Sequence, residues 1–193
     1  MKRAGVLALQ GDFEAHGKAL AQAGAEPVFV RTAADLENID GLIIPGGEST
    51  TMLKLLHAEN MLQPISDFGR DRPIFGTCAG VILLARQVSN PAQESLGILD
   101  LEVERNGYGR QIDSRVAALE PSPDFHSRTG KKGNLEAVFI RAPIIRRVGP
   151  EAKVLASYNG DPVLVEQGRH LAATFHPELT SDARVHQLFL SKL

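Results

Sequence analysis

Short apolar runs alternate with helical patterns through the first half of the chain, and this alternation limits its fold more than any other feature. Apolar runs predict strands at 5–9, 27–30, 41–44 and 73–75, and helical patterns predict helices at 13–23, 50–58 and 79–86. Strands that alternate with helices form units in which neighbouring strands run parallel and the connections are right-handed. We therefore expect a parallel, largely buried sheet.

The second half of the chain is richer in strand patterns. Candidate strands lie at 101–103, 115–119, 137–140, 154–157, 162–165 and 171–175, and a closing helix is predicted at 183–193. The segment 120–134 contains two prolines, two glycines and two lysines, so we interpret it as a surface loop. The expected fold is one α/β domain spanning 1–193, with three α/β/α layers around a mixed, mostly parallel central sheet.

Composition excludes several classes of function. The 193 residues carry a formal net charge of -2, which gives no reason to expect nucleic acid or a membrane as partner. No stretch is long enough to span a bilayer, and the first apolar run is too short for a signal peptide. A single cysteine excludes an internal disulfide and any multi-cysteine metal site, and a lone thiol is typical of a reducing compartment. We expect a cytoplasmic protein.

That single cysteine, Cys78, lies at the corner between a predicted strand and a predicted helix. Gly76 and Gly80 flank it in a Gly-x-Cys-x-Gly pattern, which is the nucleophile-elbow pattern with sulfur in place of the serine oxygen. The start of a helix favours the thiolate, which is the reactive form of a cysteine. Taken alone, Cys78 is as readily interpreted as a small buried apolar residue.

Two further polar loops follow predicted strands, and ligands of open α/β sheets bind beyond the carboxyl ends of the strands. The segment 45–51 holds two adjacent glycines, which let a ligand approach the backbone closely, although it also reads as a plain turn with a Ser49 or Thr50 helix cap. The other loop contains His176 and Glu178. Residues two apart in an extended segment face the same way, so this carboxylate can orient this imidazole as a base for Cys78.

A thiolate that attacks a carbonyl needs two N–H donors for the oxyanion that develops. The elbow pattern assigns one donor to Ala79, the residue after the cysteine. We expect the second donor to be Gly47, because its loop should reach the same end of the sheet.

These motifs resemble those of the triad-type (class I) glutamine amidotransferases, which release ammonia from glutamine. Within that family the match narrows to the glutaminases that serve pyridoxal 5'-phosphate (vitamin B6) synthesis. Six segments carry the resemblance, in the order of the family and from end to end of the chain: 5–11, 41–51, 75–80, 103–111, 139–143 and 175–180. Two departures are Tyr108, where the family usually has phenylalanine, and a segment at 124–134 that is longer than usual.

The resemblance implies a role for each of the residues that match. Cys78 would be the nucleophile, His176 the general base and acid, and Glu178 the group that orients the histidine. The resemblance assigns the glutamine to Gly47, Glu48, Ser49, Arg105, Ile140 and Arg141. An arginine suits the α-carboxylate of glutamine and Glu48 its α-ammonium group, while the choice between the two arginines stays open. No metal or organic cofactor is implied.

The resemblance also implies a partner, a synthase subunit with a (β/α)-barrel fold that takes the ammonia. We expect this subunit to dock near Gln10 and the helix around His16, because the first strand should end beside the active-site loops. His16 is otherwise interpreted as an exposed helix histidine. Three alternatives remain: a glutaminase subunit of another pathway, a different cysteine hydrolase such as a peptidase, and a binding module without activity.

Overall fold

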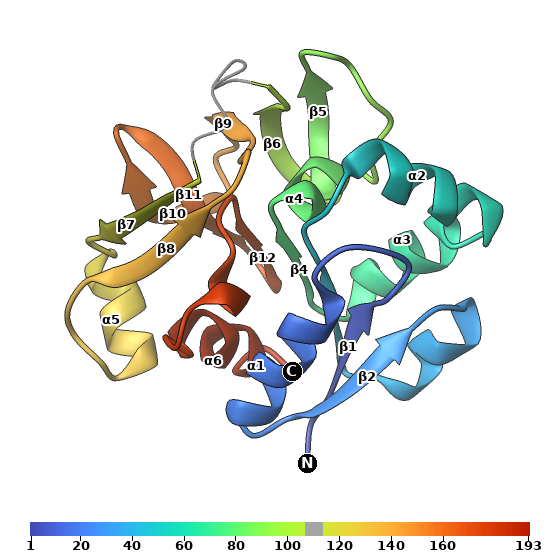
Figure 1. Cartoon of the computed structure of the whole chain (residues 1–193), viewed down its shortest axis with the longest axis horizontal. Helices are drawn as coiled ribbons and strands as arrows, with labels where there is room; N and C mark the ends of the chain where they lie inside the picture. The colour runs from blue at the N-terminus through green and yellow to red at the C-terminus, as the bar shows by residue number, and fades with distance from the viewer. Residues whose placement is uncertain (107–113) are drawn as a thin grey trace.

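A seven-stranded mixed sheet forms the centre of the molecule in the computed structural model, which describes residues 1–106 and 114–193 (Figure 1). Its strands lie in the order β10-β11-β12-β4-β3-β1-β2. Their bounds are β1 Arg3–Leu7, β2 Glu26–Val30, β3 Gly41–Ile44, β4 Ile74–Thr77, β10 Ala152–Tyr158, β11 Asp161–Gln167 and β12 His170–Ala173. The pairs from β12 to β2 are parallel, and β10, β11 and β12 pair antiparallel. The expected mixed, mostly parallel sheet is confirmed.

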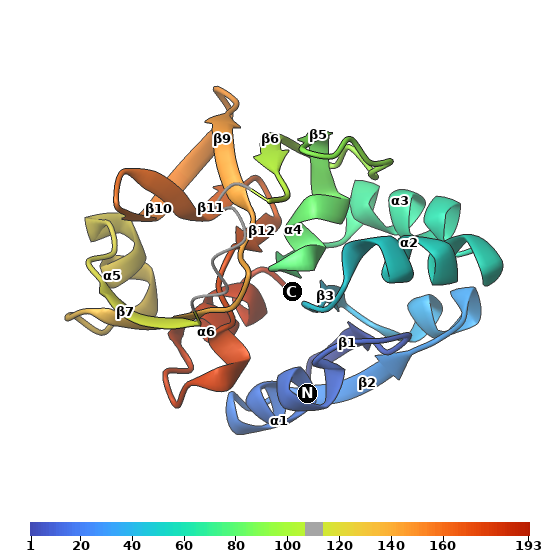
Figure 2. The ribbon, with the colours of Figure 1, turned by 45° about the horizontal axis from the view of Figure 1, so that its top comes forward.

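Helices cover both faces of this sheet, as the two views show (Figures 1 and 2). On one face lie α1 and α6, which pack side by side although they come from opposite ends of the chain. On the other face lie η1, a 3-10 helix, with α2, α3 and α4. The bounds are α1 Phe13–Gln22, η1 Ala33–Asn38, α2 Ser49–Ala58, α3 Leu62–Asp71, α4 Ala79–Leu84 and α6 Arg184–Leu190.

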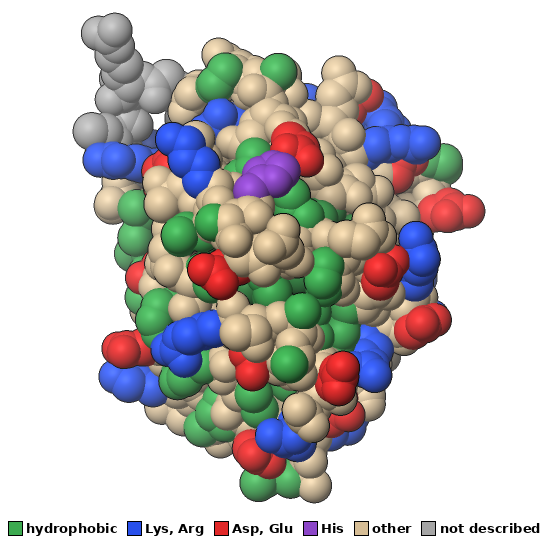
Figure 3. Space-filling model, turned by 90° about the vertical axis from the view of Figure 1, so that its right-hand side faces the viewer, with side chains coloured by type: hydrophobic (Ala, Val, Ile, Leu, Met, Phe, Trp, Pro, Cys, Tyr) green, Lys and Arg blue, Asp and Glu red, His purple; other side chains and the backbone are tan. Residues whose placement is uncertain are grey.

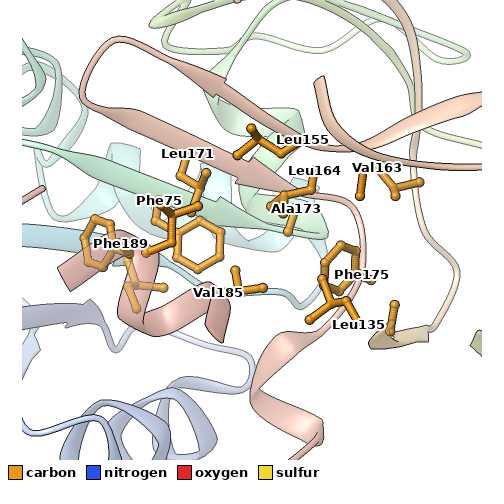
Figure 4. Packing of buried hydrophobic residues seen from close by; sticks show 14 of the residues in the cluster. Phe75, Leu135, Leu155, Val163, Leu164, Leu171, Ala173, Phe175, Val185 and Phe189 are labelled. Atoms are coloured by element: carbon orange, nitrogen blue, oxygen red, sulfur yellow. The ribbon is translucent and has the colours of Figure 1, made fainter. Parts of the chain in front are cut away.

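The alternation of side chains along the strands builds a separate apolar core on each face. In β3, Ile43 points to the cluster that contains α1 and α6, whereas Leu42 and Ile44 point to the cluster that contains α2, α3 and α4. All three side chains are fully buried, as a strand covered on both faces requires. Figure 4 shows part of the first cluster, where Phe75 of β4 packs against Phe189 of α6.

Two smaller sheets extend the molecule beside the main one. One has the order β5-β6-β9 and the other pairs β7 with β8. The bounds are β5 Ala85–Ser89, β6 Leu99–Glu104, β7 Arg115–Leu119, β8 Leu135–Phe139 and β9 Ile144–Val148. Strands β5 and β9 and helix α3 are not among the elements expected from the sequence, and the helix expected at 79–86 ends at Leu84 because the backbone of Ala85 is already extended.

The interpretation of 120–134 as a surface loop is wrong, because helix α5 (Pro123–Thr129) forms within it. The hydroxyl of Ser122 accepts the N–H of Phe125, proline occupies the first turn, and Gly130 ends the helix with a φ of 66°. These are ordinary start and stop signals of a helix. Phe125 is fully buried and anchors α5 to the core. Proline and glycine here mark the two ends of a helix instead of a loop.

The surface over α2, α3 and β2 carries charges of both signs without a continuous patch of either sign (Figure 3). This face therefore offers no single-signed field that would attract a polyanion. Within residues 1–106 and 114–193, no helix is both long and apolar enough to cross a membrane.

Candidate active site

A sharp turn between β4 and α4 presents Cys78. Its backbone has φ 48° and ψ -108°, a conformation that residues other than glycine rarely adopt. The two flanking glycines make room for the turn: a Cβ at Gly76 would lie 2.7 Å from the carbonyl oxygen of Gly80, and a Cβ at Gly80 would lie 2.1 Å from that of Ile44. Such strain is typical of functional sites. The predicted elbow is present, and 6% of Cys78 remains exposed.

His176 and Glu178 reach Cys78 from the neighbouring strand. They follow β12, which pairs in parallel with β4, so the two loops leave the same end of the sheet. Nδ1 of His176 lies 2.6 Å from Oε1 of Glu178, in a short hydrogen bond between two buried side chains. The carboxylate belongs to η2 (Pro177–Leu179) and its side chain is completely shielded from solvent. The pairing expected from their spacing is therefore formed.

The local electrostatics favour a protonated His176. Burial disfavours the imidazolium, but hydrogen bonds and charge interactions with Cys78 and Glu178 outweigh burial and raise the pKa of His176 to about 10. Sγ of Cys78 also lies 3.7 Å from the carbonyl oxygen of Ile140, a contact that the neutral thiol makes as a weak donor. Transfer of the thiol proton to His176 would leave a thiolate beside an imidazolium, which is the reactive form of such a pair.

A cavity of about 560 Å³ opens in front of Cys78. Nine of the residues assigned from the sequence line it: Gly47, Glu48, Ser49, Cys78, Ala79, Arg105, Ile140, Arg141 and His176. Glu178 lies behind His176 instead. The sequence did not indicate Asp12, Ile82, Asn106 and Ser114, which also line the cavity. Of these, Asp12 follows β1 at the same sheet edge. The rule that ligands bind beyond the carboxyl ends of the strands could therefore have indicated Asp12 as well.

The two residues predicted to supply the oxyanion donors both line this cavity. Ala79 is the first residue of α4, and the first N–H groups of a helix have no partner within it. Gly47 has a φ of 149°, and its backbone packs so closely on Gln10 that a Cβ there would lie 2.4 Å from Nε2 of that side chain. Oε1 of Gln10 accepts the N–H of Glu48 at 3.2 Å. Gln10 therefore supports the segment that carries Gly47.

The carboxylate of Glu48 is engaged with its own helix. It accepts the backbone N–H groups of Thr50 and Thr51 and the hydroxyl of Thr51, and so caps the start of α2. Partial burial opposes the charge, but these hydrogen bonds outweigh it and lower the pKa of Glu48 from 4.5 to about 2. Arg105 lies 3.7 Å away and donates to Thr50 Oγ1 at 2.9 Å. Arg105 is thus already beside Glu48, the residue expected to contact the α-ammonium group of glutamine.

This cap gives a testable dependence of stability on pH. Because the pKa of Glu48 is lower in the folded chain, its contribution is present above pH 4.5 and is lost as pH falls toward 2. We expect Glu48→Gln to lower the free energy of unfolding at pH 7 by about 1 kcal/mol, a cap value with no addition for this exposed charge. Urea denaturation of both proteins at pH 7 and at pH 3 measures the difference, which should shrink at the lower pH. An equal difference at both values would contradict a role for the charge.

His16 does not lie on the surface. Its side chain is fully buried beneath α1, and it makes hydrogen bonds to Thr77 and His186 inside the protein. The interpretation as an exposed helix histidine is therefore wrong, and His16 can contact a docking partner only if α1 moves. Its pattern in the sequence gave no sign of this, because a lone histidine in an amphipathic helix is compatible with either face.

Among the residues that the structure describes, one group of side chains has the atoms to hold a cation. Asp12, His176 and Glu178 each place an oxygen or nitrogen atom within 4.8 Å of the other two, and Asp12 Oδ2 lies 3.6 Å from His176 Nδ1. The hydrogen bond between His176 and Glu178 already uses two of these groups, so a cation would have to displace the proton that joins them. The residues fit a histidine oriented by carboxylates better than a metal centre.

Fold and site together define an α/β protein whose cysteine stands on a nucleophile elbow beside a carboxylate-bound imidazole, a class that cleaves carbonyl compounds through a covalent intermediate. Comparison with known proteins makes the class specific. A family model matches residues 6–193, and the chain belongs to the SNO glutamine amidotransferase family. The resemblance seen in the sequence motifs is confirmed.

Individual relatives agree with this assignment. A protein of Solibacter usitatus named pyridoxal 5'-phosphate synthase subunit PdxT is 67% identical over the full length of both chains. A protein of Koribacter versatilis with the same name is 54% identical, over 96% of this chain and 93% of its own. A crystal structure described as a glutamine amidotransferase superposes with a TM-score of 0.88 and 44% identity, covering 98% of this chain and 97% of the other. The motif at 103–111 falls partly on residues 107–113, Tyr108 among them, which lie outside the described residues.

Proposed function

We propose that this chain, acting as one domain over 1–193, hydrolyses L-glutamine to L-glutamate and ammonia and passes the ammonia to a synthase subunit that makes pyridoxal 5'-phosphate. The observation that carries the proposal is that Cys78 and His176 line one cavity and Glu178 holds the histidine from behind, in a chain 67% identical to a relative named as a subunit of that synthase. Residues of the motifs at 41–51, 103–111 and 139–143 line the same cavity.

In the first step the Cys78 thiolate attacks the side-chain amide carbon of glutamine. The carbonyl oxygen becomes an oxyanion, and the N–H groups of Ala79 and Gly47 are the donors that we assign to it. The intermediate collapses with cleavage of the C–N bond. His176 gives its proton to the departing nitrogen, so ammonia leaves and a thioester remains on Cys78.

In the second step the thioester is hydrolysed. His176, now neutral, takes a proton from water as the water oxygen attacks the thioester carbon. The same two N–H groups serve the second oxyanion, and its collapse releases glutamate and the thiolate. Glu178 holds Nδ1 of His176 in both steps, so that the other ring nitrogen faces the cysteine. Neither step requires a metal or an organic cofactor from this chain.

Binding of the amino acid is assigned to the rim of the cavity. Arg105 and Arg141 both line it. The backbone of Arg141 is strained, with a φ of 47°, directly after Ile140, whose carbonyl oxygen contacts Cys78. A guanidinium can hold the α-carboxylate of glutamine in two parallel hydrogen bonds. Ser49 donates its hydroxyl to Oε1 of Gln93 at 3.0 Å, which fixes this side chain at the rim.

We infer a synthase partner because ammonia is mostly protonated in neutral water and is then no nucleophile, so direct transfer to the next active site preserves it. The partner is expected to have a (β/α)-barrel fold. The docking face that we propose comprises Gln10 and the exposed side of α1, where a groove of about 600 Å³ separates the helix from residues 178–181. Lys18 and the 43% exposed Leu179 lie along this groove.

The experiment that tests this function measures glutamate release from L-glutamine by the purified chain, alone and with the synthase subunit of the same organism. We expect release that increases when the synthase subunit is added, and labelled nitrogen from glutamine that appears in pyridoxal 5'-phosphate. Release that ignores this partner would favour a glutaminase of another pathway. Cleavage of peptides instead of glutamine would favour a different cysteine hydrolase, and no turnover at all would favour a binding module.

The docking face has its own test. Gln10→Ala and Lys18→Glu should weaken complex formation with the synthase subunit and reduce the stimulation of turnover, measured by analytical ultracentrifugation and by glutamate release. Lys54→Glu, on the outer side of α2 and away from this groove, is the matched charge reversal. If Gln10→Ala and Lys18→Glu left both the complex and the stimulation intact, the docking face would lie elsewhere.

A further inference from the structure

Behind the triad, on the side away from the cavity, lies a cluster of buried polar side chains that the mechanism above does not use. It consists of His16, Thr77 and His186, and it reaches Glu178. They come from α1, β4, α6 and η2, so four separate elements meet at this point. All four are buried, His16 completely. Placing such groups in a core costs free energy unless they are paired, which makes this cluster unusual for an apolar interior.

The contacts of the cluster form a line that ends at the triad. Nε2 of His186 lies 3.0 Å from Nδ1 of His16. On the other side of the same ring, Nε2 of His16 lies 3.1 Å from Thr77 Oγ1 and 3.3 Å from Oε2 of Glu178. The opposite oxygen of that carboxylate, Oε1, holds His176 at 2.6 Å. Oε2 is buried and, within the part of the chain that the structure describes, has no hydrogen-bond partner, although Nε2 of His16 lies within ion-pair distance of it.

The positions of the protons follow from which groups can donate. Burial, reinforced by the repulsion that a charge on His186 or His176 would add, holds the pKa of His16 well below 6.5, and burial lowers the pKa of His186 to about 4. Both rings are therefore neutral. A neutral imidazole has one N–H, and a carboxylate only accepts. If Nδ1 of His16 carried the proton, the lone pair of its Nε2 would face the lone pairs of Glu178. A proton on Nε2 removes this repulsion: the ring then donates to Thr77 Oγ1, Nε2 presents its N–H at 3.3 Å from Oε2, and Nδ1 accepts from His186.

We propose that His16 is a positioning residue of the triad: its Nε2–H, fixed in place by the hydrogen bond from His186, faces Oε2 of Glu178 and holds the carboxylate in the orientation that His176 requires. One oxygen of Glu178 then serves the catalytic imidazole and the other is held from behind. Without a donor on that side the carboxylate can rotate about its side chain, and the ring of His176 loses its alignment with Cys78. This inference rests on the proposed function, because it concerns the same triad.

A purely structural role would be the simpler explanation, since buried histidines commonly satisfy one another. The two explanations differ in what they predict. A structural pair contributes to stability alone, whereas a positioning residue changes turnover more than it changes substrate binding. The chain contains a control in His170, a half-buried histidine of β12 whose Nδ1 accepts the N–H of Ile74 and which is not among the residues that line the cavity.

The first measurement reads the protons directly and needs no activity. In protein labelled with ¹⁵N-histidine, NMR should show His16 as a neutral ring with its proton on Nε2 between pH 6 and 8. Groups facing His16 are His186 from α6, Thr77 from β4, and Glu178 and His176 from the loop after β12. In Glu178→Gln the Nε2 signal of His16 should shift while that of His170 stays unchanged. A proton on Nδ1, or no response to Glu178→Gln, would overturn the proposal.

The second measurement uses turnover of the full chain, assayed with its synthase partner. We expect His16→Leu to lower kcat about tenfold or more, the effect of losing one polar contact with the carboxylate of Glu178, with KM for glutamine unchanged. His16→Gln, which can still present an N–H near the same place, should recover part of kcat. His170→Leu should lower the melting temperature and leave kcat unchanged.

The outcomes separate this inference from the proposed function. If the wild-type chain hydrolyses glutamine and His16→Leu does so with an unchanged kcat, His16 only fills the core. If kcat falls in His170→Leu as much as in His16→Leu, the loss reflects general destabilisation and the positioning role is refuted. If the wild-type chain does not hydrolyse glutamine at all, the proposed function fails, and the NMR measurement still decides where the proton of His16 lies.

Discussion

The Cys78→Ala variant is expected to lose glutamine hydrolysis by on the order of 10⁴-fold or more, the size of effect seen when the nucleophile of a catalytic triad is removed. Alanine keeps the Cβ at the strained φ of 48° and removes only the sulfur, so the elbow and the cavity should persist. No other cysteine is present to replace it. Glutamate release with the synthase partner present measures the loss, and circular dichroism checks that the fold is kept.

A double variant sharpens this test. Residues of a triad act as a unit, so removing a second member after the nucleophile costs little more. We expect Cys78→Ala combined with His176→Ala to be no less active than Cys78→Ala alone, while glutamine still binds to Cys78→Ala in calorimetry. Turnover in the alanine variant close to that of the wild type would assign the nucleophile to another group. Additive losses in the double variant would show that the two residues act separately.

The inner strands of the central sheet could be predicted because they are buried on both faces and are therefore almost continuously apolar. The run at Gly41–Ile44 matches the observed β3 at both ends. Start signals were as informative where side chains cap their own backbone: Thr32 and Asp35 form the capping box expected from their spacing, and η1 begins there. In these places the local sequence and the tertiary structure favour the same conformation.

Predictions failed where burial by distant segments decides the structure. Helix α5 was missed because its single deep anchor, Phe125, is held by residues far along the chain, and Arg184 of α6 bonds the carbonyl oxygens of Gly133 and Asn134 just after the helix. His16 was misplaced for the same reason: its partner His186 is 170 residues away. The pattern of apolar residues within a short segment of sequence carries no information about a contact between residues so far apart.

The candidate site was more predictable than the fold around it. Each residue that the sequence assigns to the triad or to the glutamine contacts lies at the cavity or directly behind it, because the carboxyl ends of parallel strands meet at one edge. What the motifs could not reveal is how the carboxylates are used. Glu48 caps α2 and Glu178 has a second neighbour in His16, and both facts depend on side-chain directions that spacing does not determine.

The largest expected effect on stability comes from Gly80. Replacing glycine with alanine inside a helix usually stabilises a protein by about 0.5–1 kcal/mol, since alanine has less freedom to lose on folding. At Gly80 the new Cβ would lie 2.1 Å from the carbonyl oxygen of Ile44 and 3.0 Å from its carbonyl carbon. These are backbone atoms of β3, which no rotamer change can move. We therefore expect Gly80→Ala to lower the free energy of unfolding by about 3 kcal/mol, measured by urea denaturation.

Gly69 provides the matched control, because it also lies within a helix, α3, and its added Cβ would meet only the ends of side chains, Cδ1 of Ile74 and of Ile98, at 3.1 Å. Such atoms can shift by a few tenths of an ångström, so Gly69→Ala should stay within about 1 kcal/mol of the wild type. Equal effects in the two variants would mean that helix propensity, and not the contact with Ile44, governs both. A selective loss at Gly80 would show that α4 must touch the backbone of β3 for the elbow to form. Because β3 leads directly into the loop of Gly47, the same contact sets the distance between the cysteine and the second oxyanion donor.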